Sequence, residues 1–399
     1  MTVRDLLLPF ALRNGIVHQD DPTRLRGHAR IPTMDAMKDF EPHPWLRNAH
    51  LMTIAAAFWR RKFPRLPAGE ARLFDLEPAS TVGGLGTQMR GDCHWQKNPR
   101  EHGTIILVHG LEGSSDSGYV LGTAEKAFVA GFNVVRLNQR NCGGTEHLTP
   151  HLYHSGRSDD IRAVVMELIE RDRLPEIFAA GFSMGGNLVL KMAGEFGDAA
   201  PEQVRGFAGI APSFVLEACA DALEQPRNFI YERYFVRKLK RRMRRKAELF
   251  PDQYAARVGN GAMRAIGSVR EFDERITAPC SGFAGADDYY AQASAVNVIG
   301  AIRRPTLILT AQDDPFVPYV TFERRELREN PNIQLVAPRY GGHCSFIGRQ
   351  GGDERFWCEA RIVEFFREHS HLAEVSAASG KEKADPSLRF AKGSRRVSG

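Results

Sequence analysis

The sequence predicts an α/β fold in which a mostly parallel central sheet is flanked by helices and interrupted by an inserted helical cap. Two observations support this prediction. Between Thr104 and Ala211, short apolar runs typical of buried strands alternate with segments of helical spacing, and the alternation resumes at Pro305. The stretch in between is richer in charged and aromatic residues and has no clear strand pattern. Because such alternation favours a parallel sheet with right-handed crossovers, we interpret that stretch as an insertion.

The individual elements have local sequence signals. The run TIILV at 104–108 is short and continuously apolar, as expected for a strand that is buried on both faces. Ahead of it, two strands at 71–77 and 87–95 flank a glycine-rich turn, which predicts an antiparallel pair. Further strands are expected at 132–137, 177–182, 206–211, 305–310 and 333–337, and helices at 118–130, 157–171, 184–196, 319–329 and 354–368.

These elements divide the chain into consecutive segments. Residues 1–70 form an N-terminal segment that wraps the core, 71–211 and 303–372 form the two parts of the α/β core, and 212–302 form the cap. The tail at 373–399 is polar and poor in hydrophobic residues, so we expect it to be disordered. With 399 residues, of which 43% are hydrophobic, the chain is long enough for one large domain with a cap.

Composition indicates where the protein resides and what it binds. The six cysteines are scattered without a CxxC pair, which favours reduced thiols and a cytoplasmic location over a zinc site or a disulfide framework. No apolar run is long enough to span a bilayer, and the first 14 residues lack the features of a secretory signal. Much of the net charge of +6 lies in the run 237–246 and in the tail, so a nucleic-acid-binding surface is not implied.

The strongest chemical motif is the G-x-S-x-G pattern at 181–185, which lies at the end of an expected strand and the start of an expected helix. A sharp strand-to-helix turn lifts the hydroxyl of Ser183 clear of the sheet. Strand and helix approach so closely at this turn that larger side chains at 181 and 185 would clash, which explains the two glycines. In this context the motif predicts the nucleophile of an α/β-hydrolase fold.

A serine hydroxyl needs a base, and this fold supplies its serine, acid and histidine in that order along the chain. His343 lies in the loop after the strand expected at 333–337 and would accept the serine proton. Two aspartates, Asp313 and Asp314, follow the strand expected at 305–310. Asp314 is favoured as the acid that orients His343 because it precedes a Pro-x-Val-Pro segment, whereas Asp313 is the alternative that caps the turn.

An oxyanion hole requires two backbone N–H groups that point at the developing negative charge. The amide of Met184, which follows the nucleophile, supplies one of them. The second is expected from the loop after 104–108, which reads HGLEG, and the amide of Leu111 is the candidate. His109 in the same loop is interpreted as structural rather than catalytic.

The basic run from Arg237 to Lys246, in the expected cap, has two interpretations. The first is a solvated helix face. The second is a cationic rim that attracts anionic lipid headgroups or acidic acyl substrates, which would allow peripheral contact with an anionic membrane surface. Metal and nucleotide cofactors are not indicated, because the sequence has no HExxH, P-loop or helix-opening GxGxxG motif.

Several stretches together resemble the YheT-like branch of the α/β-hydrolases, which also holds eukaryotic abhydrolase-domain lipases and yeast acyltransferases that form ethyl esters. The resemblance covers about 42–366 and rests on 50–54, 109–114, 138–144, 153–156, 181–187, 270–273, 288–290 and 313–316. It implies a catalytic triad that falls on Ser183, Asp314 and His343. It also implies hydrolysis of carboxylic esters or phospholipids, with acyl transfer to an alcohol in some members.

These observations predict a serine hydrolase that cleaves carboxylic esters of small molecules or lipids through an acyl-enzyme. One alternative is an acyltransferase that passes the acyl group to an alcohol, and another is a catalytically silent binding protein on the same fold. The chain departs from the family at Met52, where Gln is usual, and at Asn141, where Gly is usual. Both departures are expected to bear on the pocket.

Overall fold

The apolar runs form one eight-stranded sheet in the computed structural model, which describes residues 39–78, 86–259 and 261–372. Its strands are β1 (Glu70–Glu77), β2 (Thr87–His94), β3 (Thr104–Val108), β4 (Asn133–Leu137), β5 (Ile177–Phe182), β6 (Val204–Ile210), β7 (Thr306–Leu309) and β8 (Ile333–Val336). Their order in the sheet is β1-β2-β4-β3-β5-β6-β7-β8. Only β1–β2 and β2–β4 pair antiparallel among these strands, so the predicted mostly parallel α/β fold is confirmed.

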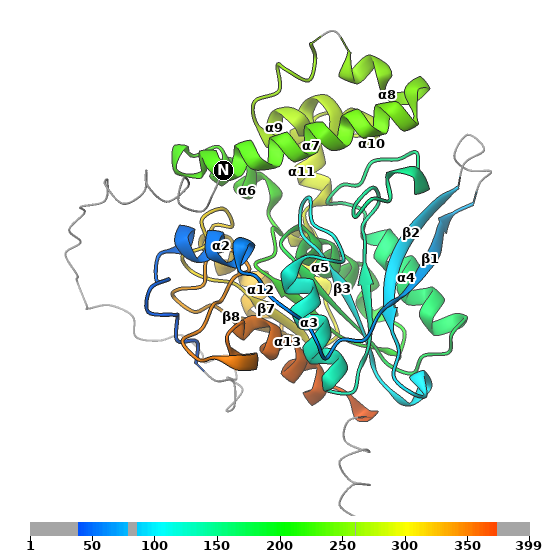
Figure 1. The fold of residues 1–399 in the computed structure, drawn as a ribbon, viewed down its shortest axis with the longest axis vertical. Coiled ribbons are helices and arrows are strands. Elements are labelled where there is room, and N and C mark those ends of the chain that lie inside the picture. The colour runs from blue at the N-terminus through cyan, green and yellow to red at the C-terminus, as the bar shows by residue number, and fades with distance from the viewer. Residues whose placement is uncertain (1–38, 79–85, 260, 373–399) are drawn as a thin grey trace, which may run out of the picture.

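Helices cover both faces of the sheet (Figure 1). They are α3 (Gly118–Val129), α4 (Ser158–Glu170), α5 (Met184–Phe196) and α13 (Trp357–Glu368). In β3, Ile105 and Leu107 pack with side chains of α3 and α13, whereas Ile106 and Val108 pack with side chains of α4 and α5. This division follows from the two-residue period of a strand, which directs successive side chains to opposite faces.

Most element boundaries agree with the sequence-based prediction. The bounds of β3, β5 and α5 are the expected ones, and β1 and β2 form the expected antiparallel pair. The prediction of one helix at 319–329 is wrong. The chain forms a 3₁₀ turn, η9 (Tyr319–Glu323), and a single helical turn, α12 (Arg325–Arg328), because Arg324 between them is extended, with φ −64° and ψ 141°. The glycine-rich turn before β2 lies almost wholly outside the described residues.

The segment 212–302, called the cap below, contains helices and no strand within its described part. Its main helices are α6 (Leu216–Leu223), α7 (Phe229–Leu249), α8 (Pro251–Val258), α9 (Val269–Phe272), α10 (Ala278–Ser281) and α11 (Ala286–Ala293). The long helix α7 crosses the top of the molecule in Figure 1. Val236, Leu239 and Met243 of α7 belong to the same apolar cluster as the α4 and α5 side of the sheet. The cap is therefore packed directly on the core.

The N-terminal segment contributes helix α2 (Ala49–Phe58), which begins where the side chain of Asn48 accepts a hydrogen bond from the amide of Leu51 at 3.1 Å. After α2, the guanidinium of Arg61 pairs with Glu359 of α13 at 2.6 Å, and the Glu359 side chain is only 1% exposed. Residues 39–70 are thus attached to the core. The predictions for 1–38 and for the tail lie outside the described residues. Within the part of the chain that is described, no helix has the length and apolarity needed to cross a membrane.

Candidate active site

Ser183 occupies a sharp turn between β5 and α5, with backbone angles of φ 54° and ψ −119° that side-chain-bearing residues rarely adopt. Glycines permit the close approach at this turn. A Cβ atom on Gly181 would lie 2.0 Å from the carbonyl oxygen of Gly185, and one on Gly185 would lie 2.4 Å from the carbonyl oxygen of Val108. The predicted steric reason for both glycines is confirmed, and Ser183 lines a pocket between core and cap.

The imidazole of His343 is hydrogen-bonded to Asp314, the aspartate favoured by the sequence. Its Nδ1 lies 2.8 Å from Oδ2 of Asp314, whose side chain is fully buried. The other carboxylate oxygen, Oδ1, accepts hydrogen bonds from the amides of Phe316 and Val317, both at 3.0 Å. A carboxylate held in this way favours the proton on Nδ1, which leaves Nε2 as a proton acceptor.

The adjacent Asp313 has a different task. Its Oδ1 accepts a hydrogen bond at 2.9 Å from the amide of Gly342, the residue before His343. Burial raises the pKa of Asp313, and the neighbouring charge of Asp314 raises it further. Asp313 therefore shapes the histidine loop, while Asp314 contacts the histidine ring itself. The sequence offered Asp313 as the cap of its own turn, and this prediction is wrong. It is Asp314 that accepts from two backbone amides in that turn, whereas Asp313 bonds to the loop of His343.

Two contacts place the loop of His343 beside the Ser183 turn. The ring of Phe316 packs against the imidazole, with 4.0 Å between ring centroids, and Phe316 lines the same pocket as Ser183. In addition, the carbonyl oxygen of Ile210 accepts from the amide of Ser183 at 2.8 Å and from the thiol of Cys344 at 3.5 Å. The loops after β5, β7 and β8 thus bring the three predicted triad residues to one edge of the sheet.

Helix α2 holds the histidine loop from outside, which the sequence analysis missed. The hydroxyl of Thr53 accepts a hydrogen bond from the amide of His343 at 2.9 Å, and it donates to the carbonyl of Ala49 at 2.7 Å. A Cβ atom on Gly342 would lie 2.7 Å from this hydroxyl, so the contact requires glycine there. The resemblance of 50–54 to the YheT-like branch was the only sequence signal at Thr53, and it carried no role.

The loop after β3 lies against the nucleophile, as an oxyanion loop must. A Cβ atom on Gly110 would be 3.1 Å from that of Ser183. The amide of Gly110 donates to the hydroxyl of Tyr119 at 3.0 Å, so this donor is already used. Leu111 and Met184, whose amides are the two predicted donors, both line the pocket beside Ser183. This placement is compatible with the predicted oxyanion hole.

His109 supports that loop from behind. Burial lowers its pKa to about 4, so the ring is neutral. Its Nε2 accepts from the amide of Gln139 at 3.1 Å, which leaves Nδ1 to donate to the carbonyl of Gly110 at 2.8 Å. With both nitrogens engaged in structural hydrogen bonds, His109 has the structural place that the sequence predicted for it.

The pocket itself is a mostly apolar cavity with room for several water molecules. Its cavity volume is about 110 Å³, far above the roughly 10–15 Å³ that one water requires by the same measure. Apolar side chains from the cap form much of its wall, among them Leu216, Leu223, Leu239, Met243, Val269 and Phe272. A serine hydroxyl at the edge of an apolar cavity suits a substrate with an acyl or lipid chain.

The basic run of α7 divides into an inner and an outer face. Arg242 points inward, where its Nε donates to Oε1 of Glu112 at 2.7 Å and its Nη2 donates to Oε2 at 3.0 Å. Lys238 donates to the backbone carbonyl of Glu112 at 2.6 Å. Glu112 follows Leu111 and has a left-handed φ of 57°. The cap therefore fixes the loop that carries the second predicted oxyanion donor, a link that neither interpretation of the run anticipated.

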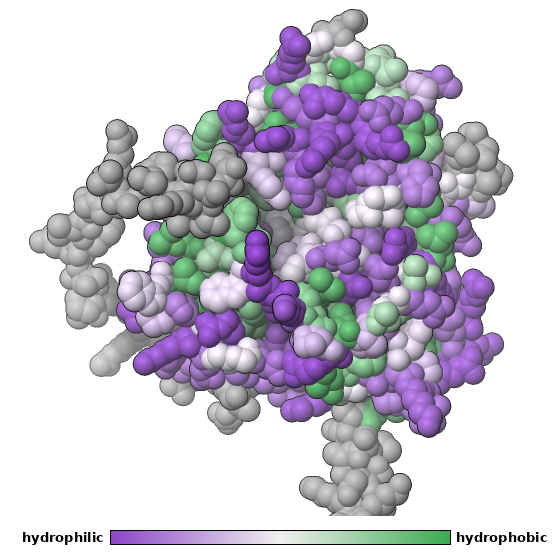
Figure 2. Space-filling model, in the orientation of Figure 1, coloured by the Kyte–Doolittle hydropathy of each residue, from purple (hydrophilic) through white to green (hydrophobic). Residues whose placement is uncertain are grey.

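Apart from Lys246, the rest of the run agrees with a solvated face. Lys246 is an inner residue, which contacts the carbonyls of Thr149 and, at 3.2 Å, Glu146, and burial lowers its pKa to about 7. On the outer side, Arg237, Arg241 and Arg244 are exposed, and hydrophilic side chains cover this part of the cap in Figure 2. Contact of this face with an anionic membrane surface stays a prediction, which salt-dependent binding to anionic vesicles would test.

Replacing Arg242 with methionine is expected to lower the free energy of unfolding by about 3–5 kcal/mol. The reason is that Glu112, with a side chain only 2% exposed, would lose its cation while remaining buried. The matched control is Arg241→Met, which removes an exposed arginine from the same helix and should change stability by no more than about 0.5 kcal/mol. Denaturant unfolding of both variants measures the difference. Equal stabilities would show that the Arg242–Glu112 pair does not hold the loop.

The two departures from the family have structural explanations outside the pocket. Asn141 adopts a left-handed φ of 64°, which glycine tolerates best and asparagine next, and its Nδ2 donates to the carbonyl of His151 at 2.8 Å. Met52 is fully buried against Ile347 and Phe356. Neither Asn141 nor Met52 is among the residues that line the pocket. Neither side chain therefore forms part of the pocket wall.

The chain has relatives of known family. Residues 103–350 match a family described as alpha/beta hydrolase fold. YheT of Escherichia coli (strain K12), which is named as an esterase, is 30% identical over 84% of this chain and 97% of its own length. The phospholipase ABHD3 of Mus musculus is 32% identical over 61% of this chain and 58% of its own length. The medium-chain fatty acid ethyl ester synthase/esterase 2 of Saccharomyces cerevisiae is 28% identical over 67% and 62%.

Proposed function

Because the chain belongs to the α/β-hydrolase family, in the branch of YheT, we propose that it is a serine hydrolase that cleaves carboxylic esters through an acyl-enzyme intermediate. The names of its relatives as esterases and phospholipases support ester hydrolysis in general. The observation that carries the specific proposal is the hydrogen bond of 2.8 Å between His343 and the fully buried carboxylate of Asp314, on loops adjacent to the Ser183 turn. A histidine oriented by a carboxylate is the base that activates the serine of such hydrolases, and this supports the proposal.

In the proposed reaction, Oγ of Ser183 attacks the ester carbonyl while Nε2 of His343 takes the hydroxyl proton. Asp314 stabilises the imidazolium that forms, and the amides of Met184 and Leu111 hydrogen-bond to the oxyanion. His343 then returns the proton to the departing alcohol. A water molecule, deprotonated by the same nitrogen, attacks the acyl-enzyme and releases the acid together with free Ser183.

An alcohol in place of that water would give acyl transfer. The name of the yeast relative, which includes ethyl ester synthesis, makes this the second candidate. Both functions need the same acyl-enzyme and differ only in the acceptor. Product analysis with added ethanol separates them, since transfer yields ethyl ester faster than free acid.

The direct test of the acyl-enzyme proposal is labelling with an organophosphonate, which reacts with activated serines. We expect one adduct, which peptide mass spectrometry places on Ser183. Ser213 lines the same pocket and serves as the internal comparison, because its hydroxyl has no predicted base. The unlabelled protein should turn over short nitrophenyl esters, and labelling should abolish this turnover. Folded protein that carries no adduct, or an adduct on Ser213, would contradict the proposal.

A further inference from the structure

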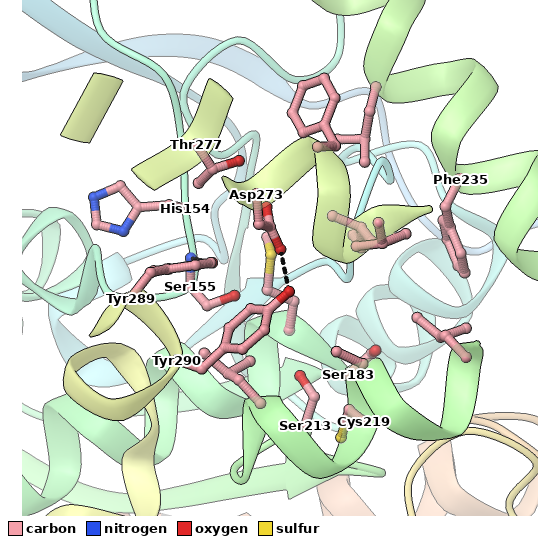
Figure 3. Close-up of a pocket in the computed structure, with 18 of the residues that line it drawn as sticks. His154, Ser155, Ser183, Ser213, Cys219, Phe235, Asp273, Thr277, Tyr289 and Tyr290 are labelled. Atoms are coloured by element: carbon pink, nitrogen blue, oxygen red, sulfur yellow. Dashed lines mark hydrogen bonds between the residues drawn. The ribbon is translucent and has the colours of Figure 1, made fainter. Parts of the chain in front are cut away.

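A second polar group faces the cavity into which Ser183 points. The hydroxyl of Tyr290, from α11, donates to Oδ2 of Asp273 at 2.9 Å. Both residues line the pocket together with Ser183. Figure 3 shows the Tyr290 hydroxyl directed at the Asp273 carboxylate, with the side chains of Ser183 and Ser213 on another side of the same space. The triad does not use this pair.

The carboxylate of Asp273 stands in surroundings that disfavour a charge. Of its two neighbours in the chain, Phe272 lines the pocket with other apolar side chains of the cap, whereas Glu274 is exposed. Arg270, the cation whose charge acts on it, forms its ion pairs with Asp221, Glu224 and Asp287 instead. Burial raises the pKa of Asp273 to about 6, even though hydrogen bonds from Thr277 and Tyr290 and the charge of Arg270 act to lower it. A carboxylate in an apolar cavity costs free energy unless hydrogen bonds or a counter-charge offset the cost, and a donor on the substrate would add to that compensation.

The backbone at Asp273 is also unusual. It begins a π-helical turn, Asp273–Thr277, between α9 and α10. Single π turns are rare and occur frequently at functional sites, where they redirect side chains. Asp273 and Thr277 at the two ends of this turn both line the pocket. The geometry of the cap thus presents the carboxylate to the cavity rather than to solvent.

We propose that Asp273 and Tyr290 form a polar subsite that accepts a hydrogen bond from a hydroxyl group of the substrate, so that the preferred esters are hydroxylated. An ionised carboxylate only accepts hydrogen bonds, and the hydroxyl of Tyr290 already donates its proton to Asp273. The carboxylate of Asp273 and the hydroxyl oxygen of Tyr290 can therefore both accept a hydrogen bond from the substrate. This inference rests on the proposed function, because the ester must lie with its carbonyl at Ser183. The apolar wall of the pocket between Ser183 and the Asp273–Tyr290 pair would contact the hydrocarbon part of the bound ester.

The test compares kcat/KM for paired esters with and without a hydroxyl group. One pair consists of p-nitrophenyl ω-hydroxyalkanoates and p-nitrophenyl alkanoates of equal length, and the other of glycerol monoesters and propyl esters of one acid. We expect a preference of about 10- to 100-fold for the hydroxylated partner in one of the pairs, as for a hydrogen bond to a charged group. The pair that shows it tells whether the hydroxyl belongs to the acyl or to the alcohol part.

Two variants assign the preference to the subsite. Asp273→Asn and Tyr290→Phe should each reduce the ratio of kcat/KM between hydroxylated and plain ester by about tenfold. Asp252→Asn, at an exposed aspartate of α8 that does not line the pocket, is the control and should leave that ratio at the wild-type value. Equal kcat/KM for both members of both pairs in the wild-type protein would overturn the subsite while leaving the esterase proposal intact. Absence of turnover with every ester would overturn the proposed function itself.

Discussion

Replacing Ser183 with alanine is expected to lower kcat for ester hydrolysis by about a million-fold, since the triad acts as a unit and its other members lose their function with the nucleophile. The oxyanion donors and the pocket remain, so slow attack by water leaves a residual rate above that of free solution. The substitution removes only a hydroxyl from a turn whose backbone angles are set by its neighbours. Steady-state kinetics with a nitrophenyl ester, after removal of any contaminating esterase, measures the effect.

Ser213→Ala is the control for that experiment. Ser213 lines the same pocket, and its amide donates to the carbonyl of Ser183 at 3.3 Å, a backbone contact that alanine retains. Loss of its hydroxyl should therefore have a far smaller effect on kcat. Thermal unfolding of both variants checks that they are folded. A Ser183→Ala protein that keeps its activity would show that another residue is the nucleophile.

The sequence was sufficient for the parts of the fold and site that depend on local patterns. The apolar run at 104–108 and the glycines around Ser183 identify a buried strand and a strand-to-helix turn, and both are where they were expected. The assignment of Asp314 over Asp313 followed from a short motif, Pro-x-Val-Pro, and the hydrogen bonds agree with it. Each of these signals lies within a few residues of the feature that it predicts.

The contacts that sequence reasoning missed join positions that are far apart in the chain. Thr53 and His343 are 290 residues apart, and Glu112 and Arg242 are 130 residues apart. A single sequence carries no pairwise information over such distances, and Arg242 is hidden in a run of similar cations. Asp273 was part of a recognised stretch, but its meaning depends on Tyr290 and on the apolar wall of the pocket. These relations exist only after the cap has packed on the core.

The substitution of Asp314 by asparagine is expected to lower kcat by about ten-thousand-fold, as loss of the correct histidine tautomer does in serine hydrolases. The hydrogen bonds around Asp314 supply the reason. Its Oδ1 accepts from the amides of Phe316 and Val317, so in the variant the amide oxygen must take this position. The NH₂ group then faces Nδ1 of His343, which must give up its proton and accept. The proton moves to Nε2, which can no longer act as the base.

Asp313→Asn separates this effect from the loss of any buried charge in the loop. The amide oxygen of asparagine can still accept from the amide of Gly342, as Oδ1 of Asp313 does in the histidine loop. Because Asp314, and not Asp313, is hydrogen-bonded to the imidazole, kcat should fall far less in Asp313→Asn. Kinetics of the two variants under identical conditions give the comparison. A larger loss from Asp313→Asn than from Asp314→Asn would reverse the assignment, because it would require the histidine to turn toward the other carboxylate during the reaction.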